Sequence, residues 1–282
     1  MKIFSTVFIA VFLSLGISLA AYANPKKSGV TPEQEHIEML YPTVLVRLAQ
    51  GSGSGTVIYS ELNEEQEYES YVLTNYHVIQ SSVKITKVWS SEKNEHVETE
   101  NRRPVNIDLW EYNNFSTAIG TMGRIADIVA YDKSRDLALL RVKDRERQMS
   151  YVATLYPEGL DEGPWIFQTV YAVGAGLGKP PFPTMGLLAG YSRDQDGNEL
   201  YLSSSPIIFG NSGGSLYVFS PRRTYELIGV PSMVSAYGWG NVVSHMAWSR
   251  PIAEIRIFLR ENKYGFILGD EPEPEEEDED AS

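Results

Sequence analysis

The sequence predicts an all-β protein of closed or sandwiched sheets with one helix near its C-terminal end. Short runs rich in Val, Ile, Leu, Thr and Tyr recur between Gly, Asn, Asp and Pro residues, as strands recur between turns. The one long segment with helical spacing of apolar residues is 249–262, which follows all of these runs. Many strands followed by one terminal helix indicate packed sheets and not βαβ units.

The predicted elements follow in order along the chain. Residues 31–40 predict a short helix, because Thr31 and Gln34 form a capping-box pair and Pro32 takes the first helical position. The clearest predicted strands are 44–50, 55–60, 71–74, 136–142, 165–172, 214–219 and 225–230. The apolar stripe of the terminal helix consists of Ile252, Ile255, Phe258 and Leu259, with Pro251 near its start and Gly265 beyond its end.

Composition excludes several functions. The 282 residues are 43% apolar and 22% charged, a balance typical of a globular protein. A formal net charge of −13 argues against nucleic-acid binding, which needs clustered Lys and Arg. The chain has no cysteine, so disulfides, zinc–thiolate sites and thiol nucleophiles are excluded, and no metal or cofactor is expected.

The N-terminal end predicts export. Residues 1–23 have a basic start, an apolar centre and an Ala21-Tyr22-Ala23 ending, which predicts a signal peptide cleaved after Ala23. The alternative is a retained membrane anchor, because the stretch is nearly long enough to span a bilayer. In both cases the body is expected outside the cytoplasm, in the periplasm or the external medium. After cleavage, no membrane binding is expected.

A cluster of turn residues at 156–164 divides the body into two strand-rich halves. We therefore expect an N-terminal segment with the short helix at 24–40, a first half at 41–160, and a second half with the terminal helix at 161–265. Residues 266–282 predict a disordered tail, because 270–280 hold nine acidic side chains and no base. A calcium-binding or partner-docking tail is the alternative.

Three short segments carry residue types that fit one mechanism. They are TNYHV at 74–78, DLALL at 136–140 and GNSGG at 210–214. Each alone is typical of a loop or turn. A serine hydroxyl becomes a good nucleophile only when a neighbouring base takes its proton. An imidazole can be that base near neutral pH, and a carboxylate fixes the tautomer of the imidazole. Glycines beside the serine let backbone N–H groups point at an oxygen that becomes negative.

Together with GSGSGTVI at 51–58, these motifs occur in the order His, Asp, Ser. This arrangement resembles the trypsin-like (chymotrypsin-fold) serine peptidases, specifically the bacterial HtrA-like branch, over roughly residues 40–262. The resemblance implies two six-stranded antiparallel β-barrels followed by the C-terminal helix. It also implies a serine endopeptidase that hydrolyses protein or peptide substrates through an acyl-enzyme, which the N-terminal segment predicts to be exported. The oligomeric state is not readable from the sequence.

By position, the resemblance implies that His77 is the general base, Asp136 its orienting acid and Ser212 the nucleophile. The backbone N–H groups of Gly210 and Ser212 would form the oxyanion hole. Asp132 is the nearest rival for the acid, but Asp136 directly precedes the apolar strand, as the family motif requires. The histidines expected at the surface are His36 and His96.

Two alternatives concern the same serine. GNSGG also fits G-x-S-x-G, the nucleophile elbow of α/β-hydrolases, a fold that runs Ser, acid, His and enters a helix after the serine. Between Ser212 and His245 the only acid is Glu226, and residues 213–218 predict a strand, so this interpretation fails twice. The other alternative is a catalytically weak peptide-binding or chaperone-like protein on a peptidase scaffold.

Two departures from the relatives bear on regulation. Asn211 stands where the digestive enzymes carry an acid that pairs with a freed N-terminus, so no zymogen switch of that kind is expected. After the helix at 251–262 only the acidic tail follows, which leaves no room for a PDZ domain such as the HtrA-like branch usually carries.

The resemblance places the walls of the primary specificity pocket at 203–209, 231–235 and about 243–246. None of these segments contains Asp or Glu, so cleavage after Lys or Arg is not expected, because a buried cation needs a carboxylate partner. A small or apolar side chain is expected instead. The pocket residues are Pro206, Ile207, Ser232, Met233, Val234 and His245. His245 could instead accept a glutamate side chain, or lie on a strand outside the pocket.

Overall fold

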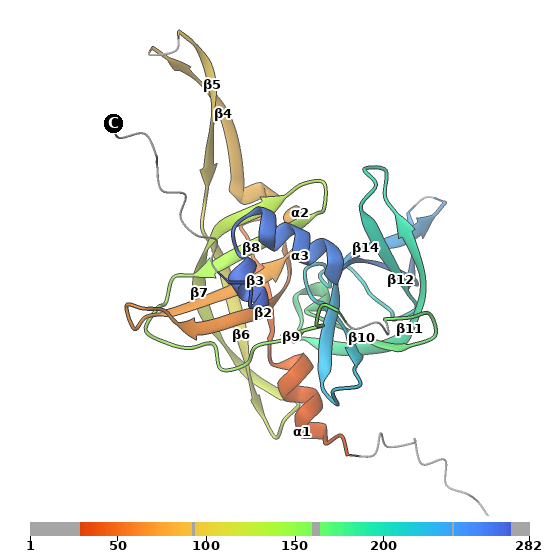
Figure 1. Ribbon diagram of the computed structural model, residues 1–282. Coiled ribbons are helices and arrows are strands. Elements are labelled where there is room, and N and C mark those ends of the chain that lie inside the picture. The colour runs from red at the N-terminus through yellow and green to blue at the C-terminus, as the bar shows by residue number, and fades with distance from the viewer. Residues whose placement is uncertain (1–28, 92–93, 160–163, 239, 272–282) are drawn as a thin grey trace, which may run out of the picture. The chain divides into compact units, whose positions relative to one another are not determined.

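Two large sets of mostly antiparallel strands form the body of the protein (Figure 1). The computed structural model describes residues 29–91, 94–159, 164–238 and 240–271, and all of its helices and strands belong to the unit that begins at Thr31. The predicted signal peptide at 1–23 and residues 272–282 of the predicted tail lie outside the described residues. Among the described residues, no helix is long and apolar enough to cross a membrane.

The first set closes into a six-stranded barrel in the spatial order β1-β2-β3-β8-β7-β6. Alternate residues of each strand point inward, and Val44, Val72 and Leu140 are fully buried in one shared core. The strands are β1 (Thr43–Arg47), β2 (Ser52–Leu62), β3 (Tyr68–Thr74), β6 (Val105–Asn113), β7 (Thr117–Asp132) and β8 (Leu137–Val142).

The second set also closes, in the order β13-β10-β11-β12-β15-β14, because β13 pairs with β14. A short strand, β9 (Thr154–Leu155), adds a parallel pairing to β14. The strands are β10 (Thr169–Gly174), β11 (Phe182–Arg193), β12 (Glu199–Ser203), β13 (Ser215–Phe219), β14 (Tyr225–Tyr237) and β15 (Asn241–Pro251). The two six-stranded antiparallel barrels confirm the expected fold class.

Helices flank the barrels. The predicted N-terminal helix is present as α1 (Pro32–Glu35) continued by η1 (His36–Leu40). Only half of the capping box forms: Gln34 N donates to Thr31 Oγ1 at 3.1 Å, but the Gln34 amide donates to Glu38 instead. The terminal helix, α3 (Ile252–Glu261), packs on β14 and β15 and buries the whole predicted apolar stripe.

The folded body extends further than predicted at its C-terminal end. After α3 the chain forms η4 (Gly265–Leu268), and Asp270 Oδ2 lies 2.8 Å from Arg260 Nε on α3. The predicted boundary at 265 therefore falls inside the body, because an ion pair and a further helical turn hold the next residues against α3.

A two-stranded ribbon was not expected. β4 (Val83–Ser90) and β5 (Glu95–Arg102) follow α2 (Tyr76–Ile79) and η2 (Gln80–Ser82), and they stand away from the barrel in Figure 1. Most of the described ribbon side chains are exposed, so the sequence lacks the inside–outside alternation that marks a half-buried strand.

Candidate active site

The first two motifs meet at the end of the first barrel. His77 lies on α2, directly after β3, and Asp136 immediately precedes β8. The backbone N–H of His77 donates to Asp136 Oδ1 at 2.9 Å, and His77 Nδ1 lies 2.8 Å from Asp136 Oδ2. An ionised carboxylate only accepts hydrogen bonds, so Nδ1 is the donor in this contact.

Two further groups hold Asp136. The Ser232 hydroxyl donates to Asp136 Oδ2 at 2.5 Å, and the Asn75 side-chain amide donates to the Asp136 carbonyl at 2.8 Å. Ser232 belongs to β14 of the second barrel, so the acid is held from both barrels. Sequence reasoning placed Ser232 in the pocket wall and did not single out the side chain of Asn75. No local pattern marks either contact, because Ser232 and Asp136 are 96 positions apart.

The third motif, which contains Ser212, also contacts Ser232. Ser212 Oγ donates to the Ser232 carbonyl at 3.4 Å, a long hydrogen bond. Among the described residues, no hydrogen bond joins Ser212 to His77. Asp136 and Ser212 therefore both contact Ser232, whose side chain binds the Asp136 carboxylate and whose backbone carbonyl binds Ser212, and His77 contacts Asp136.

Glycines shape the backbone on both sides of Ser212. Gly210 and Gly213 have φ values of +96° and +85°, in the left-handed region that favours glycine. A Cβ on Gly213 would lie 2.2 Å from the Ser54 carbonyl oxygen and 2.3 Å from Thr74 Oγ1. The Gly210 carbonyl accepts from Ser54 Oγ at 2.6 Å. The N–H groups of Gly210 and Ser212 make no hydrogen bond within the described part of the chain.

The rival acid lies elsewhere. Asp132 accepts hydrogen bonds from the backbone and the guanidinium of Arg135, at 2.9 and 2.6 Å, and Asp136 is the carboxylate on His77. Asn211 is buried, and its side-chain oxygen accepts from the backbone N–H of Ile208 at 3.1 Å.

The other predicted surface histidines differ from each other. His96 is exposed on β5, in a T-shaped contact with Trp89. His36 is half-buried, and its Nε2 lies 2.6 Å from Ser116 Oγ. His36 thus lies at the surface as predicted, but it is only partly exposed and forms an exposed hydrogen bond to a residue 80 positions away.

The expected pocket segments lie next to each other. Ile207 N donates to the Ser244 carbonyl at 2.9 Å, which joins the segment before Ser212 to β15. Pro206, Met233 and His245 are exposed, whereas Ile207 is buried and Val234 half-buried. His245 lies on β15 between Val243 and Ala247, where the register with β14 shifts. The described side chains make no hydrogen bond or ion pair with His245.

Tyr76 and Tyr131 connect the region of His77 to the ribbon. The ring of Tyr76, next to His77, lies 5.1 Å from the ring of Tyr131, whose hydroxyl donates to Glu100 at 2.6 Å. Burial, together with the hydrogen bond to Glu100, raises the pKa of Tyr131 to about 12. The same hydrogen bond is the main reason that the pKa of Glu100 lies below its ordinary value. The ribbon is thus fastened to the barrel beside α2.

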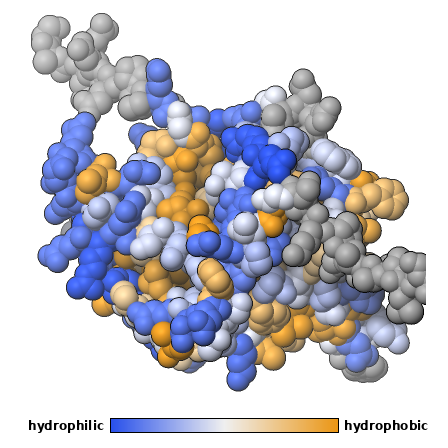
Figure 2. All heavy atoms as spheres, turned by 90° about the horizontal axis from the view of Figure 1, so that it is seen from below, coloured by the Kyte–Doolittle hydropathy of each residue, from blue (hydrophilic) through white to orange (hydrophobic). Residues whose placement is uncertain are grey.

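An apolar cavity lies away from these residues. It measures about 380 Å³ and is lined by residues of α1, η1 and β11, among them Met39, Leu40 and Phe182. Figure 2 shows apolar patches interrupted by hydrophilic surface on the face of the molecule seen from below. None of His77, Asp136 and Ser212 lines this cavity. Within the described residues, no group of three or more His, Asp or Glu side chains could hold a metal ion.

The sequence matches the family described as "Trypsin-like peptidase domain" over residues 53–229, a span that contains all three motifs. This match covers more than half of the chain, so the protein belongs to the trypsin-like peptidase family. Among curated proteins, none matches the chain.

Several solved structures share the fold. The HtrA-type protease AlgW with tripeptide is 17% identical with a TM-score of 0.57, and the alignment covers 84% of this chain and 64% of that one. A serine endoprotease from Yersinia pestis is 18% identical (TM-score 0.53; 86% and 68% covered). Deg5 is 20% identical (TM-score 0.51; 80% and 93% covered). This chain therefore spans less than two thirds of the length of the AlgW chain.

Proposed function

We propose that this protein is a serine endopeptidase in which Ser212 is the nucleophile, His77 the general base and Asp136 the acid that orients it. The observation that carries the proposal is the pair of hydrogen bonds from His77 to Asp136, with Ser232 between that acid and Ser212. Because Nδ1 is engaged, Nε2 is the atom that can take a proton from Ser212 Oγ.

The proposed reaction has two halves. As substrate binds, Ser212 exchanges its long bond to Ser232 for one to His77 Nε2, and its oxygen attacks the carbonyl carbon of the peptide bond. His77 takes the hydroxyl proton, and the N–H groups of Gly210 and Ser212 stabilise the oxyanion. The C–N bond then breaks as the imidazolium protonates the leaving amine. Water, deprotonated by His77, hydrolyses the acyl-enzyme and regenerates Ser212.

The proposed substrates are proteins or peptides cut after a small or apolar side chain. The buried Ile207 and half-buried Val234 support this, together with the lack of an acid in the three pocket segments. A peptide-library cleavage profile tests it: cleavage after Lys or Arg would contradict the assignment, and cleavage after Glu would favour a role for His245.

We propose export from the predicted signal peptide at residues 1–23 alone. The N-terminal residue of the protein recovered from the periplasm or medium of an expressing bacterium should be Asn24. Recovery of the chain in the cytoplasm with Met1 intact would contradict it.

The catalytic proposal is tested with a serine-directed phosphonylating reagent. The folded wild type should be labelled at Ser212, whereas Ser212→Ala should take up no label and cleave no peptide. Ser192→Ala, which removes an exposed serine on β11, is the matched control and should react like the wild type. An unlabelled, folded wild type would overturn the proposal.

A further inference from the structure

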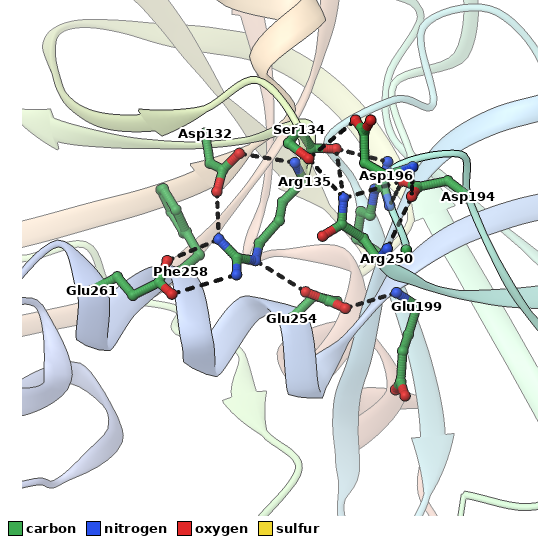
Figure 3. A network of polar contacts seen from close by, with 12 residues as sticks. Asp132, Ser134, Arg135, Asp194, Asp196, Glu199, Arg250, Glu254, Phe258 and Glu261 are labelled. Carbon is green, nitrogen blue, oxygen red and sulfur yellow. Dashed lines mark hydrogen bonds and ion pairs between the residues drawn. The ribbon is translucent and has the colours of Figure 1, made fainter.

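The turn that leads into Asp136 is held by an arginine of its own. Figure 3 shows Arg135 extending from this turn toward α3, between carboxylates of both elements. Its guanidinium lies 2.6 Å from Asp132, 3.0 Å from Glu254 and 2.8 Å from Glu261. The Arg135 side chain is 19% exposed and that of Glu254 7%. Glu254 is fixed in turn, because its other oxygen accepts from the backbone N–H of Glu199 at 2.7 Å.

The second barrel holds the residue before Arg135. The Ser134 carbonyl accepts from the Asn198 amide at 3.1 Å and from the Arg250 guanidinium at 3.3 Å. Arg250 is itself buried and paired with Asp194 at 2.6 Å. Two consecutive residues before the acid are therefore bound to groups outside the first barrel.

Asp136 needs such restraint. Its φ is +52°, a left-handed conformation that costs an aspartate free energy relative to an extended backbone. Arg135 and Asp136 share a peptide bond, so a shift of the Arg135 backbone turns the Asp136 carboxylate. The bonds from that carboxylate to His77 are 2.8 and 2.9 Å long, and a shift of about 1 Å would break them.

We propose that Arg135 is a positioning residue of the active site: its forked guanidinium ties the turn before Asp136 to α3, and so holds the acid on His77. Arg135 makes no contact with the reacting groups and acts through Asp136 alone. The inference rests on the proposed peptidase function. The fork is required because a guanidinium presents several fixed donors, whereas a lysine presents one compact charge.

The kinetic test compares Arg135 with Arg260, a second arginine that is paired with more than one carboxylate. Arg135→Gln should lower kcat about tenfold or more, because the acid is misplaced, and leave KM within about twofold. Arg135→Lys should recover only part of kcat. Arg260→Gln, which breaks ion pairs to Glu158 and Asp270 without touching the turn, should behave as wild type. An unchanged kcat in folded Arg135→Gln, full recovery with lysine, or an equal loss in Arg260→Gln would overturn the inference.

A spectroscopic test works without turnover. In a Ser212→Ala background, the proton on His77 Nδ1 should give a downfield NMR signal because it is bound to a carboxylate. Adding Arg135→Gln should weaken or abolish that signal, and adding Arg260→Gln should preserve it. If Arg135→Gln does not fold, the isosteric Glu254→Gln replaces it, with the same loss to a smaller degree. A signal that persists in folded Arg135→Gln, or in Glu254→Gln where Arg135→Gln does not fold, overturns the role of Arg135. Failure of phosphonylation in wild type overturns the peptidase proposal, whichever result the NMR signal gives.

Discussion

The two halves of the candidate active site are held in different ways. On the acid–base side, side chains do the holding: Asp136 receives hydrogen bonds from His77 and Ser232 on its carboxylate and from Asn75 on its carbonyl. On the nucleophile side, Ser212 makes one long side-chain bond, and the backbone between Gly210 and Gly213 sets its place. The acid–base half should therefore be sensitive to the loss of single polar atoms, and the nucleophile half to the gain of single carbons.

The largest effect is expected from Asp136→Asn. An amide at this position can present its N–H₂ group to His77, which favours the wrong imidazole tautomer, so kcat should fall by about 10⁴. Asp132→Asn is the control, because Asp132 contacts Arg135 and not His77; its loss should be far smaller. Steady-state kinetics on both folded variants checks this. An equal loss of kcat in the two would contradict the assignment of Asp136 over Asp132 as the orienting acid.

Gly213→Ala should disrupt the backbone around Ser212 by destabilising the fold. The new Cβ would overlap Ser54 O and Thr74 Oγ1 inside the fold, and the left-handed backbone adds strain, so the free energy of unfolding should fall by about 3 kcal/mol or more. Gly197→Ala separates the two causes, because Gly197 has a φ of +88° but nothing within 4 Å of its Cβ position. That control should lose only about 1–2 kcal/mol. Urea unfolding measures both, and similar losses would show that overlap at Gly213 is relieved.

Ser232→Ala tests the link between the halves. It removes one donor to the ionised Asp136, which should lower kcat about tenfold, while the Ser232 carbonyl remains available to Ser212. Ser249→Ala is the matched control on the neighbouring strand, because the Ser249 hydroxyl is buried without a partner among the described residues. Its removal should leave kcat unchanged and stability equal or higher. If kcat is unchanged in Ser232→Ala, two donors suffice to hold the acid.

The same contrast explains what the sequence could predict. The sequence could predict the motifs that contain His77, Asp136 and Ser212, together with the strands around them. Apolar runs and glycine turns are set by near neighbours and are therefore visible as local patterns. The contacts that hold the acid leave none: Arg135 meets Glu254 from 119 positions away. Such pairs depend on how the barrels meet α3. The ribbon of β4 and β5 was missed for a different reason, since a strand exposed on both faces needs no alternation of polar and apolar residues.

The smallest effect is on the pH dependence of stability, through the Asp194–Arg250 ion pair that binds the turn before Asp136. Partial burial raises the pKa of the Asp194 carboxyl, but hydrogen bonds from Arg250 and Asn198 outweigh it and hold the pKa below its ordinary value. A carboxyl whose pKa is lower in the folded than in the unfolded state adds stability above its unfolded pKa of about 3.9, and this stability is lost as pH falls through the folded value.

The free energy of unfolding should accordingly fall as the pH is lowered below about 4. In a Ser212→Ala background, which prevents self-cleavage, Asp194→Asn should be less stable than its parent at pH 7. The difference between the two proteins should shrink as the pH falls, because protonation removes from the parent what the substitution has already removed. Urea unfolding at several pH values measures it. A constant difference would mean that Asp194 holds Arg250 by shape alone, and that the charge of this pair does not contribute to holding the turn of Asp136.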